Sequence, residues 1–148
     1  MSSGKPNLEN LARAKQLNAE PLSTEQIGRL LASAETQLRD SRNTSLGAPS
    51  RFMLAYNAAH ALALALAALR AAGYRPSSAG HRKIIFQVLD ATADAPPELW
   101  RALDRYHDRR NASEYEGAPP ATTVEAEDMV KLTTELQRLV LARVGQGK

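Results

Sequence analysis

The sequence contains no cysteine, and this absence removes several classes of chemistry. Disulfide bonds, thiolate nucleophiles and cysteine-ligated zinc are all excluded. The three histidines, His60, His81 and His107, lack the paired spacing that is typical of a metal site, so we expect no metal and no cofactor. The sequence also contains no Ser-His-Asp order, no phosphate-cradling glycine loop and no nucleotide-binding fingerprint.

Aromatic residues are scarce as well, at 5% of the chain, and runs of β-branched residues are almost absent. Alanine and leucine dominate instead, and both favour helix over strand. A chain of 148 residues is long enough to bury the core of one domain. We therefore expect an all-α protein, with residues 1–22 as a short helix and lead-in and residues 23–148 as a single helical bundle domain.

No long hydrophobic run is present either. Met53–Leu69 is the most apolar stretch, but it contains Asn57 and His60 and is rich in alanine. A membrane-spanning helix needs about 20 predominantly apolar residues, and this stretch falls short. The first residues, Met1–Asn7, are polar and do not resemble a signal peptide. We therefore expect a cytoplasmic protein without a membrane segment.

Charge of one sign is not concentrated anywhere in the chain. The formal net charge is +3 and the sequence pI is about 9.4. This balance permits contact with nucleic acid but does not argue for it, because the sequence has no basic block.

Start and stop signals divide the chain into five to six helices. Ser23 with Gln26, and Thr122 with Glu125, have the spacing of capping boxes. The expected elements are a short helix ending near residue 21, helices over 23–39, 50–72 and 81–93, a fifth that starts at 96–97 and ends just before residue 115, and a last helix from 122 onward. Short connections favour antiparallel neighbours, so we expect an up-and-down bundle around the alanine-rich third helix.

The fifth helix has two distinct faces. Its apolar residues are expected to point inward, and they are Leu99, Trp100, Leu103, Tyr106 and His107. On another face, arginines recur every four residues beside aspartates, and these residues are Arg101, Asp104, Arg105, Asp108 and Arg109. This pattern favours a solvated surface with ion pairs along the helix, and a phosphate-binding stripe is the alternative.

Arg110 lies on the apolar side, in line with Leu99, Leu103 and Tyr106. A guanidinium in that place must find partners or a ligand, because burying a charge alone is costly. The pattern leaves two interpretations open: an arginine that clamps a neighbouring carboxylate or helix C-terminus, or a functional arginine. In both cases we expect it to be less exposed than the arginines of the charged face.

The run from Arg110 to Tyr115, Arg-Asn-Ala-Ser-Glu-Tyr, resembles the motif of the HEPN family, the "higher eukaryotes and prokaryotes nucleotide-binding" domains. In that family an arginine, usually followed by Asn, Asp or His, precedes a histidine by four to six intervening residues. The run from Arg51 to His60 resembles the start of the long HEPN helix, and parts of residues 73–82 resemble the turn after it. The resemblance covers about residues 51–117.

This resemblance implies a phosphate-binding role for Arg110, with Asn111 orienting it. The position of the family's histidine is occupied by Tyr115. A tyrosine ionises near pH 10, so it is a poor general base for metal-free RNA cleavage. Tyr115 is then expected to stack on a base or to hold Arg110 by a hydrogen bond.

Two histidines are candidates for the missing proton-transfer group. His107 lies one turn before Arg110 on the same helical face, and His60 lies one turn after Tyr56 on the central helix. His60 and the nearby Asn57 are also candidate binding residues, with Asn111 and Tyr115. For each histidine, a satisfied core residue is the competing interpretation.

Two functions follow as hypotheses. The first is a HEPN-like domain that binds nucleotide or RNA as a homodimer, in a toxin–antitoxin or defence context, with weak or no activity as a metal-independent endoribonuclease. An antitoxin or a nucleotidyltransferase-type protein is the partner that this context suggests. The second is a non-catalytic helical interaction or dimerisation module, in which Arg110 and Tyr115 only join helices.

Overall fold

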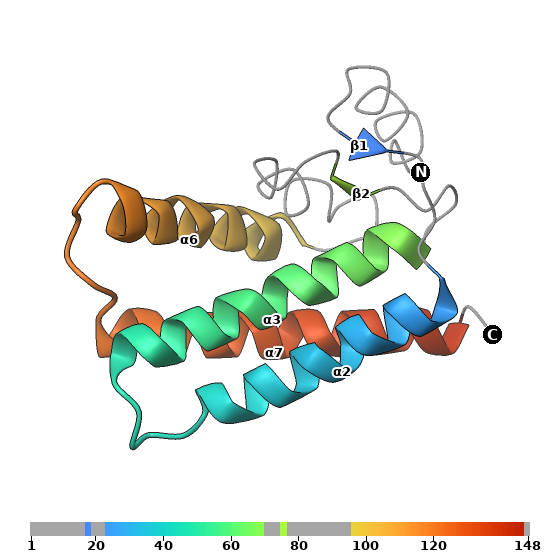
Figure 1. The fold of residues 1–148 in the computed structure, drawn as a ribbon, viewed down its shortest axis with the longest axis horizontal. Coiled ribbons are helices and arrows are strands. Elements are labelled where there is room, and N and C mark those ends of the chain that lie inside the picture. Colours follow the sequence, from blue (N-terminus) through green and yellow to red (C-terminus); the bar gives the residue numbers. More distant parts are fainter. Residues whose placement is uncertain (1–16, 19–22, 70–74, 77–95, 147–148) are drawn as a thin grey trace.

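The computed structural model describes residues 17–18, 23–69, 75–76 and 96–146 of the chain (Figure 1). Four helices account for nearly all of them: α2 (Thr24–Ser41), α3 (Ala48–Leu69), α6 (Pro97–Tyr115) and α7 (Thr123–Gln146). Two strands of two residues each, β1 (Leu17–Asn18) and β2 (Arg75–Pro76), pair antiparallel. The described chain is therefore all-α apart from this short pair.

The predicted count of five to six helices is not matched, because the described residues form four. The helix predicted over residues 81–93 lies outside the described residues. The helix predicted to end near residue 21 is wrong at its end, since Leu17 and Asn18 form β1. Their backbone pairs with Arg75 and Pro76, so a partner distant in sequence overrides the local helical pattern.

Both predicted capping boxes are confirmed, and they set where two of the helices begin. The Ser23 N–H donates to Gln26 Oε1 at 2.8 Å, and the Gln26 N–H donates back to Ser23 Oγ at 3.1 Å. At the start of α7, the Thr122 N–H donates to Glu125 Oε1 at 3.0 Å, and the Glu125 N–H donates to Thr122 Oγ1 at 3.2 Å. Each box satisfies two N–H groups that have no partner within the helix.

The observed helix ends differ slightly from the predicted ones. α2 continues to Ser41, two residues beyond the predicted end. α6 includes Tyr115, which was predicted to lie just past the helix, and ends on Glu116 as its C-cap. Gly117 follows with a φ of 73°, a conformation that glycine adopts without steric cost, and it turns the chain toward α7. The predicted end of α3 at residue 72 lies outside the described residues.

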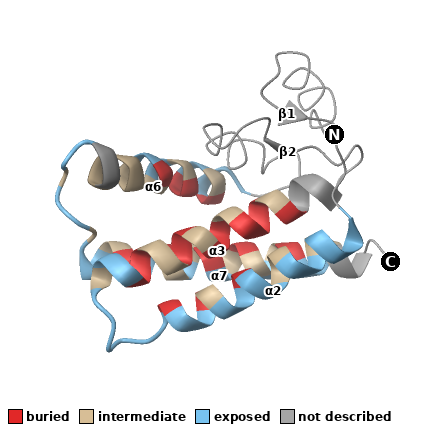
Figure 2. Ribbon diagram, viewed as in Figure 1, coloured by how far each residue is buried: buried red, intermediate tan, exposed pale blue. Residues whose placement is uncertain are grey.

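α3 is the central helix, as its alanine content predicted. It packs against α2 and α7, and α6 lies on the side of α3 opposite to α2 (Figure 1). Figure 2 shows buried residues along most of its described length. Alanines line this helix in the core, and the buried ones are Ala55, Ala58, Ala59, Ala61, Ala63 and Ala65. Their small side chains let two neighbouring helices approach the α3 backbone closely.

Arg51 closes the connection between α2 and α3. Its side chain is buried at the start of α3, and its Nε donates to the carbonyl oxygen of Ser41 at 2.9 Å. Ser41 is the last residue of α2, where carbonyl groups lack helical partners and a cation is favourable. The charge of Arg51 therefore has a structural use in this turn.

α6 is joined to the other helices mainly by large side chains. Leu99 and Leu103 are buried, and the rings of Phe52 and Tyr106 meet edge to face with centroids 5.6 Å apart. The Tyr106 hydroxyl donates to Asp128 Oδ2 on α7 at 2.7 Å. Burial and this hydrogen bond raise the pKa of Tyr106 to about 12. The predicted inward face of this helix is thus confirmed.

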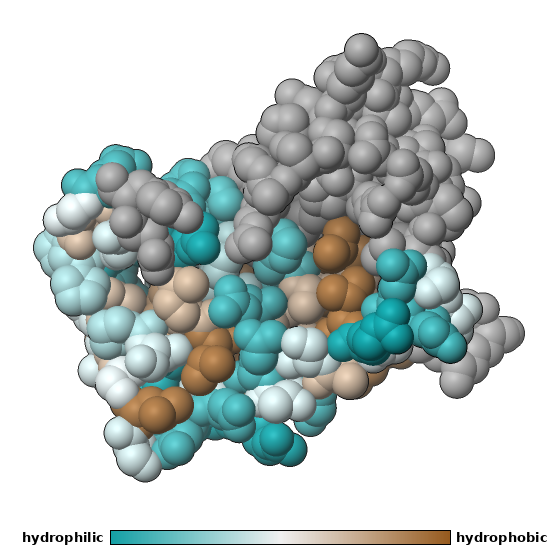
Figure 3. All heavy atoms as spheres, in the orientation of Figure 1, coloured by the Kyte–Doolittle hydropathy of each residue, from teal (hydrophilic) through white to brown (hydrophobic). Residues whose placement is uncertain are grey.

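The surface of the described part is mixed in character. In Figure 3, hydrophobic side chains reach the surface in separate places among hydrophilic ones. Of the helices that the structure describes, none combines the length and apolar character needed to span a membrane.

Candidate functional site

Four side chains from α3 and α6 form a connected cluster around Arg110, which we call the Arg110 cluster: Tyr56, His107, Arg110 and Asn111. Arg110 Nη1 donates to Asn111 Oδ1 at 3.1 Å. Asn111 Nδ2 lies 3.2 Å from His107 Nε2, and His107 Nδ1 lies 2.7 Å from the Tyr56 hydroxyl oxygen. The Arg110 guanidinium carbon lies 5.3 Å from the centre of the Tyr56 ring, which closes the cluster by a cation–π contact.

The direction of each hydrogen bond in the cluster follows from Arg110. A guanidinium can only donate, so the side-chain oxygen of Asn111 faces it and the amide NH₂ faces His107. That NH₂ can only donate, so Nε2 of His107 must accept. The imidazole is then neutral, and its Nδ1–H donates to the Tyr56 oxygen. This chain of hydrogen bonds therefore assigns His107 the tautomer with its proton on Nδ1.

His107 is not open to a ligand in this arrangement. The residue is only 6% exposed, and both of its ring nitrogens have hydrogen-bond partners. A general base needs a free lone pair within reach of the proton that it removes. Proton transfer by His107 therefore requires that one of these two hydrogen bonds opens first.

A pocket of about 320 Å³ lies beside Arg110, and we call it the Arg110 pocket. Its walls come from the start of α3, the end of α6 and the loop between α6 and α7, residues 116–122. The described residues that line it are Pro49, Phe52, Met53, Arg110, Ser113, Ala118, Pro120 and Ala121. Most of these are apolar, and Arg110 is the charged residue among them. This volume falls at the small end of the range of small-molecule sites, about 300–1,000 Å³.

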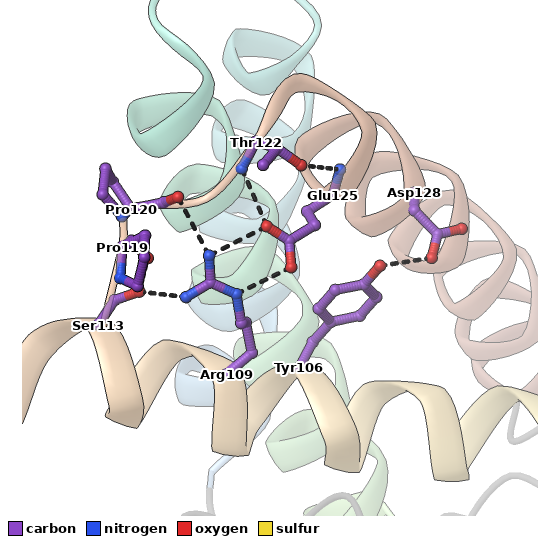
Figure 4. A network of polar contacts seen from close by, with 8 residues as sticks. All are labelled: Tyr106, Arg109, Ser113, Pro119, Pro120, Thr122, Glu125 and Asp128. Atoms are coloured by element: carbon purple, nitrogen blue, oxygen red, sulfur yellow. Dashed lines mark hydrogen bonds and ion pairs between the residues drawn. The ribbon is translucent and has the colours of Figure 1, made fainter. Parts of the chain in front are cut away.

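Arg109 differs from the prediction that placed it on the solvated face. Its side chain is only 22% exposed, whereas Arg101 and Arg105 are exposed. Arg109 Nε donates to Glu125 Oε2 at 2.8 Å, and Nη2 donates to Glu125 Oε1 at 3.0 Å (Figure 4). The start of α7 returns over this turn of α6, and the carboxylate of Glu125 covers the guanidinium.

The exposure predicted for Arg110 is confirmed in part. Arg110 is half-buried, and so it is less exposed than Arg101 and Arg105. Arg109 is half-buried as well, so the expected contrast with this arginine is not found.

The ion pair changes how both of its members titrate. The hydrogen bond from Arg109, followed by hydrogen bonds from Thr122, lowers the pKa of Glu125 to about 2. The hydrogen bond to Glu125 raises the pKa of Arg109 above its usual value. Glu125 was recognised in the sequence only as a helix-capping residue, but it also holds Arg109.

We expect acid to weaken the fold through Glu125. The pKa of this carboxyl is lower in the folded chain than in the unfolded chain, where it is about 4.3. Its contribution to the free energy of unfolding is therefore complete above about pH 4.3 and is lost as the pH falls toward 2. Solvent screens a carboxylate that is 26% exposed, so we expect a loss of about 1–2 kcal/mol.

Urea unfolding at neutral pH and at about pH 3 measures this loss, with Glu125→Gln as the matched control. The control cannot titrate at this position, so its stability should fall less over the same interval. An equal fall in both proteins would show that Glu125 is not the responsible group.

The other residues predicted for the site are placed less closely. Asn57 and His60 are half-buried on α3, one residue and one turn after Tyr56, and no described hydrogen bond joins Asn57 to the Arg110 cluster. Tyr115 is the last residue of α6, and its side chain lies outside the described part. Within the described residues, no three acidic or histidine side chains gather as a metal site would require.

Sequence reasoning missed two features of the site. The sequence placed Tyr56 only in the run from Arg51 to His60, one turn before His60. The structure brings its ring to Arg110 and its hydroxyl to His107, which lies 51 residues further along the chain. Sequence reasoning also missed the pair of Arg109 and Glu125, which are 16 residues apart. No local spacing rule links residues so far apart, so no signal in a single sequence could have identified these pairs.

The geometry as a whole can hold an anion beside an apolar surface. Arg110 offers a planar guanidinium at the edge of the pocket, and the adjoining wall contains Phe52 and Met53.

Comparisons of the chain with protein-family models, with curated proteins and with solved structures gave no match.

Proposed function

We propose that the protein is a HEPN-like helical domain that binds nucleotide or RNA at the Arg110 pocket, with weak or no ribonuclease activity. One observation carries this proposal: the arginine of the motif is the charged residue among the described residues that line the pocket. A guanidinium pairs with phosphate oxygens through parallel N–H groups, and an aromatic or apolar wall suits the face of a base. Arg110 supplies the first surface, and the half-buried Met53 with the apolar loop residues Ala118 and Ala121 supplies the second.

The residues around Arg110 support binding more than cleavage. Asn111 and Tyr56 hold the guanidinium in place, so its orientation does not have to be created when a ligand arrives. Tyr115 occupies the position of the motif's histidine, and both nitrogens of His107 are already hydrogen-bonded. Weak activity at most is therefore the expectation for metal-independent RNA cleavage.

We also propose that the protein is a cytoplasmic homodimer in which two motifs face each other. It would act in a toxin–antitoxin or defence context, with an antitoxin or nucleotidyltransferase-type protein as partner. Sedimentation velocity measures whether the chain dimerises. The alternative is a non-catalytic interaction module, and the closed hydrogen bonding of the Arg110 cluster favours it over a nuclease.

The test of binding uses the full chain with adenosine monophosphate and with a short single-stranded RNA. We expect Arg110→Gln to lower the affinity for both probes by about tenfold or more, because a hydrogen bond to a charged group contributes about 1.5–3 kcal/mol. Isothermal titration calorimetry measures the affinities, and thermal melting confirms that the variant is folded.

Arg105→Gln is the matched control, since it removes the same charge from an exposed position on the same helix. We expect it to change the affinity by less than about twofold at physiological salt, where distant charges are screened. Equal losses in the two variants, or a wild-type protein that binds neither probe, would overturn the proposed function. RNA cleavage in the presence of a chelator that depends on Arg110 would contradict the weak activity.

A further inference from the structure

Arg109 connects three parts of the chain at the Arg110 pocket, although it does not line the pocket itself. Its Nη1 donates to Ser113 Oγ at 2.6 Å, and its Nη2 donates to the carbonyl oxygen of Pro120 at 3.0 Å (Figure 4). The same guanidinium makes the two hydrogen bonds to Glu125. One side chain therefore holds the last turns of α6, the loop 116–122 and the first turn of α7 together.

The loop 116–122 forms one wall of the pocket. Ala118, Pro120 and Ala121 line the pocket, and the residues of this loop are exposed or half-buried. Ala121 packs against the core, but the rest of the loop buries little surface, so this wall depends largely on hydrogen bonds to keep its shape.

Proline limits the hydrogen bonds that this loop can form with its own backbone. Pro119 and Pro120 have no N–H group, so neither can donate to a neighbouring strand or turn. Their carbonyl groups accept from side chains of α6 instead: Ser113 Oγ donates to the Pro119 oxygen at 3.0 Å, and Arg109 donates to the Pro120 oxygen. Arg109 also donates to Ser113, so both carbonyls are held directly or indirectly by this arginine.

We infer that Arg109 is a positioning residue that fixes the loop 116–122 as a wall of the Arg110 pocket and so sets the affinity for a nucleotide bound there. The second half of this inference rests on the proposed function. Arginine is required because its planar fork reaches acceptors in several directions at once. A lysine keeps the positive charge beside Glu125 but cannot bond Glu125, Ser113 and Pro120 in the same geometry.

The experiment compares Arg109→Lys with Arg105→Lys, the same change one turn earlier at an exposed position. Hydrogen exchange followed by NMR reports the loop directly, through the amides of Ala118 and Thr122. These amides donate to the Ala112 oxygen and to Glu125 Oε1. In Arg109→Lys we expect both amides to exchange about tenfold faster or more, while core amides such as that of Ala59 keep their rates.

The affinity for adenosine monophosphate is measured on the same samples. We expect Arg109→Lys to bind it about fivefold more weakly or worse, with a melting temperature near that of wild type, and Arg105→Lys to bind it normally. Unchanged exchange at Ala118 and Thr122 would overturn the positioning role, and so would normal affinity in a variant whose loop exchanges faster. A wild-type protein that does not bind the nucleotide refutes the proposed function and the inferred effect on affinity, and exchange alone then decides whether Arg109 holds the wall.

Discussion

Leu103→Ala is expected to lower the free energy of unfolding by about 3 kcal/mol, because the change removes buried methyl groups and leaves a cavity. Leu103 is 0% exposed in the middle of α6. α6 makes few close backbone contacts with α3 and α7, so its attachment depends on such side chains. Equilibrium unfolding in urea, followed by circular dichroism, measures the change.

Leu141→Ala is the matched control for this prediction. It deletes the same atoms from a side chain on α7 that is 53% exposed. We expect its stability to stay within about 0.5 kcal/mol of wild type, because surface substitutions of this kind remove little buried area. A Leu103→Ala protein as stable as this control would mean that α6 is not packed as described.

The second large effect is expected from Ala55→Leu, two turns into α3. Ala55 is fully buried, and its carbonyl oxygen accepts a hydrogen bond from Thr133 Oγ1 on α7 at 3.1 Å. This bond shows how closely α7 approaches the backbone of α3. A larger side chain must push the helices apart or adopt a strained rotamer, so we expect a loss of about 3 kcal/mol.

Ala32→Leu provides the comparison, because Ala32 is exposed on α2 and leucine is nearly as good a helix former as alanine. We expect its melting temperature to stay close to that of wild type. The same urea titration measures both variants. If Ala55→Leu were equally harmless, the alanines of α3 would be there for helix propensity alone rather than for close helix packing.

The helix starts were predictable from the sequence because their causes are local. Ser23 and Gln26, and Thr122 and Glu125, satisfy each other across three residues, and chain connectivity alone brings them together once a helix begins. The two-residue strand β1 was not predictable in the same way. Leu17 and Asn18 are extended because Arg75 and Pro76 lie beside them.

The buried faces of the helices were also predictable, since they follow from the period of the α-helix. Apolar residues three and four positions apart share one face, and that face packs inward. Leu99 and Leu103 on α6 are buried as predicted, and Met129 and Leu136, seven residues apart on α7, are buried as well. The same period indicated that Arg110 is less exposed than Arg105.

The contacts of the candidate site could be identified only from the tertiary structure. Periodicity assigned Arg105 and Arg109 to one solvated face, and nothing in their spacing distinguishes them. The loop after α6 brings Glu125 back over Arg109 alone, so that arginine becomes half-buried and holds the loop.

Tyr56 and His107 form their bond in the same way, through the packing of α3 against α6. By itself the sequence predicted the four described helices and their inward faces, because those depend on interactions within one or two turns. The partners of Arg109, Arg110 and His107 were decided only by the fold, because hydrogen bonds between distant residues depend on where a second segment returns.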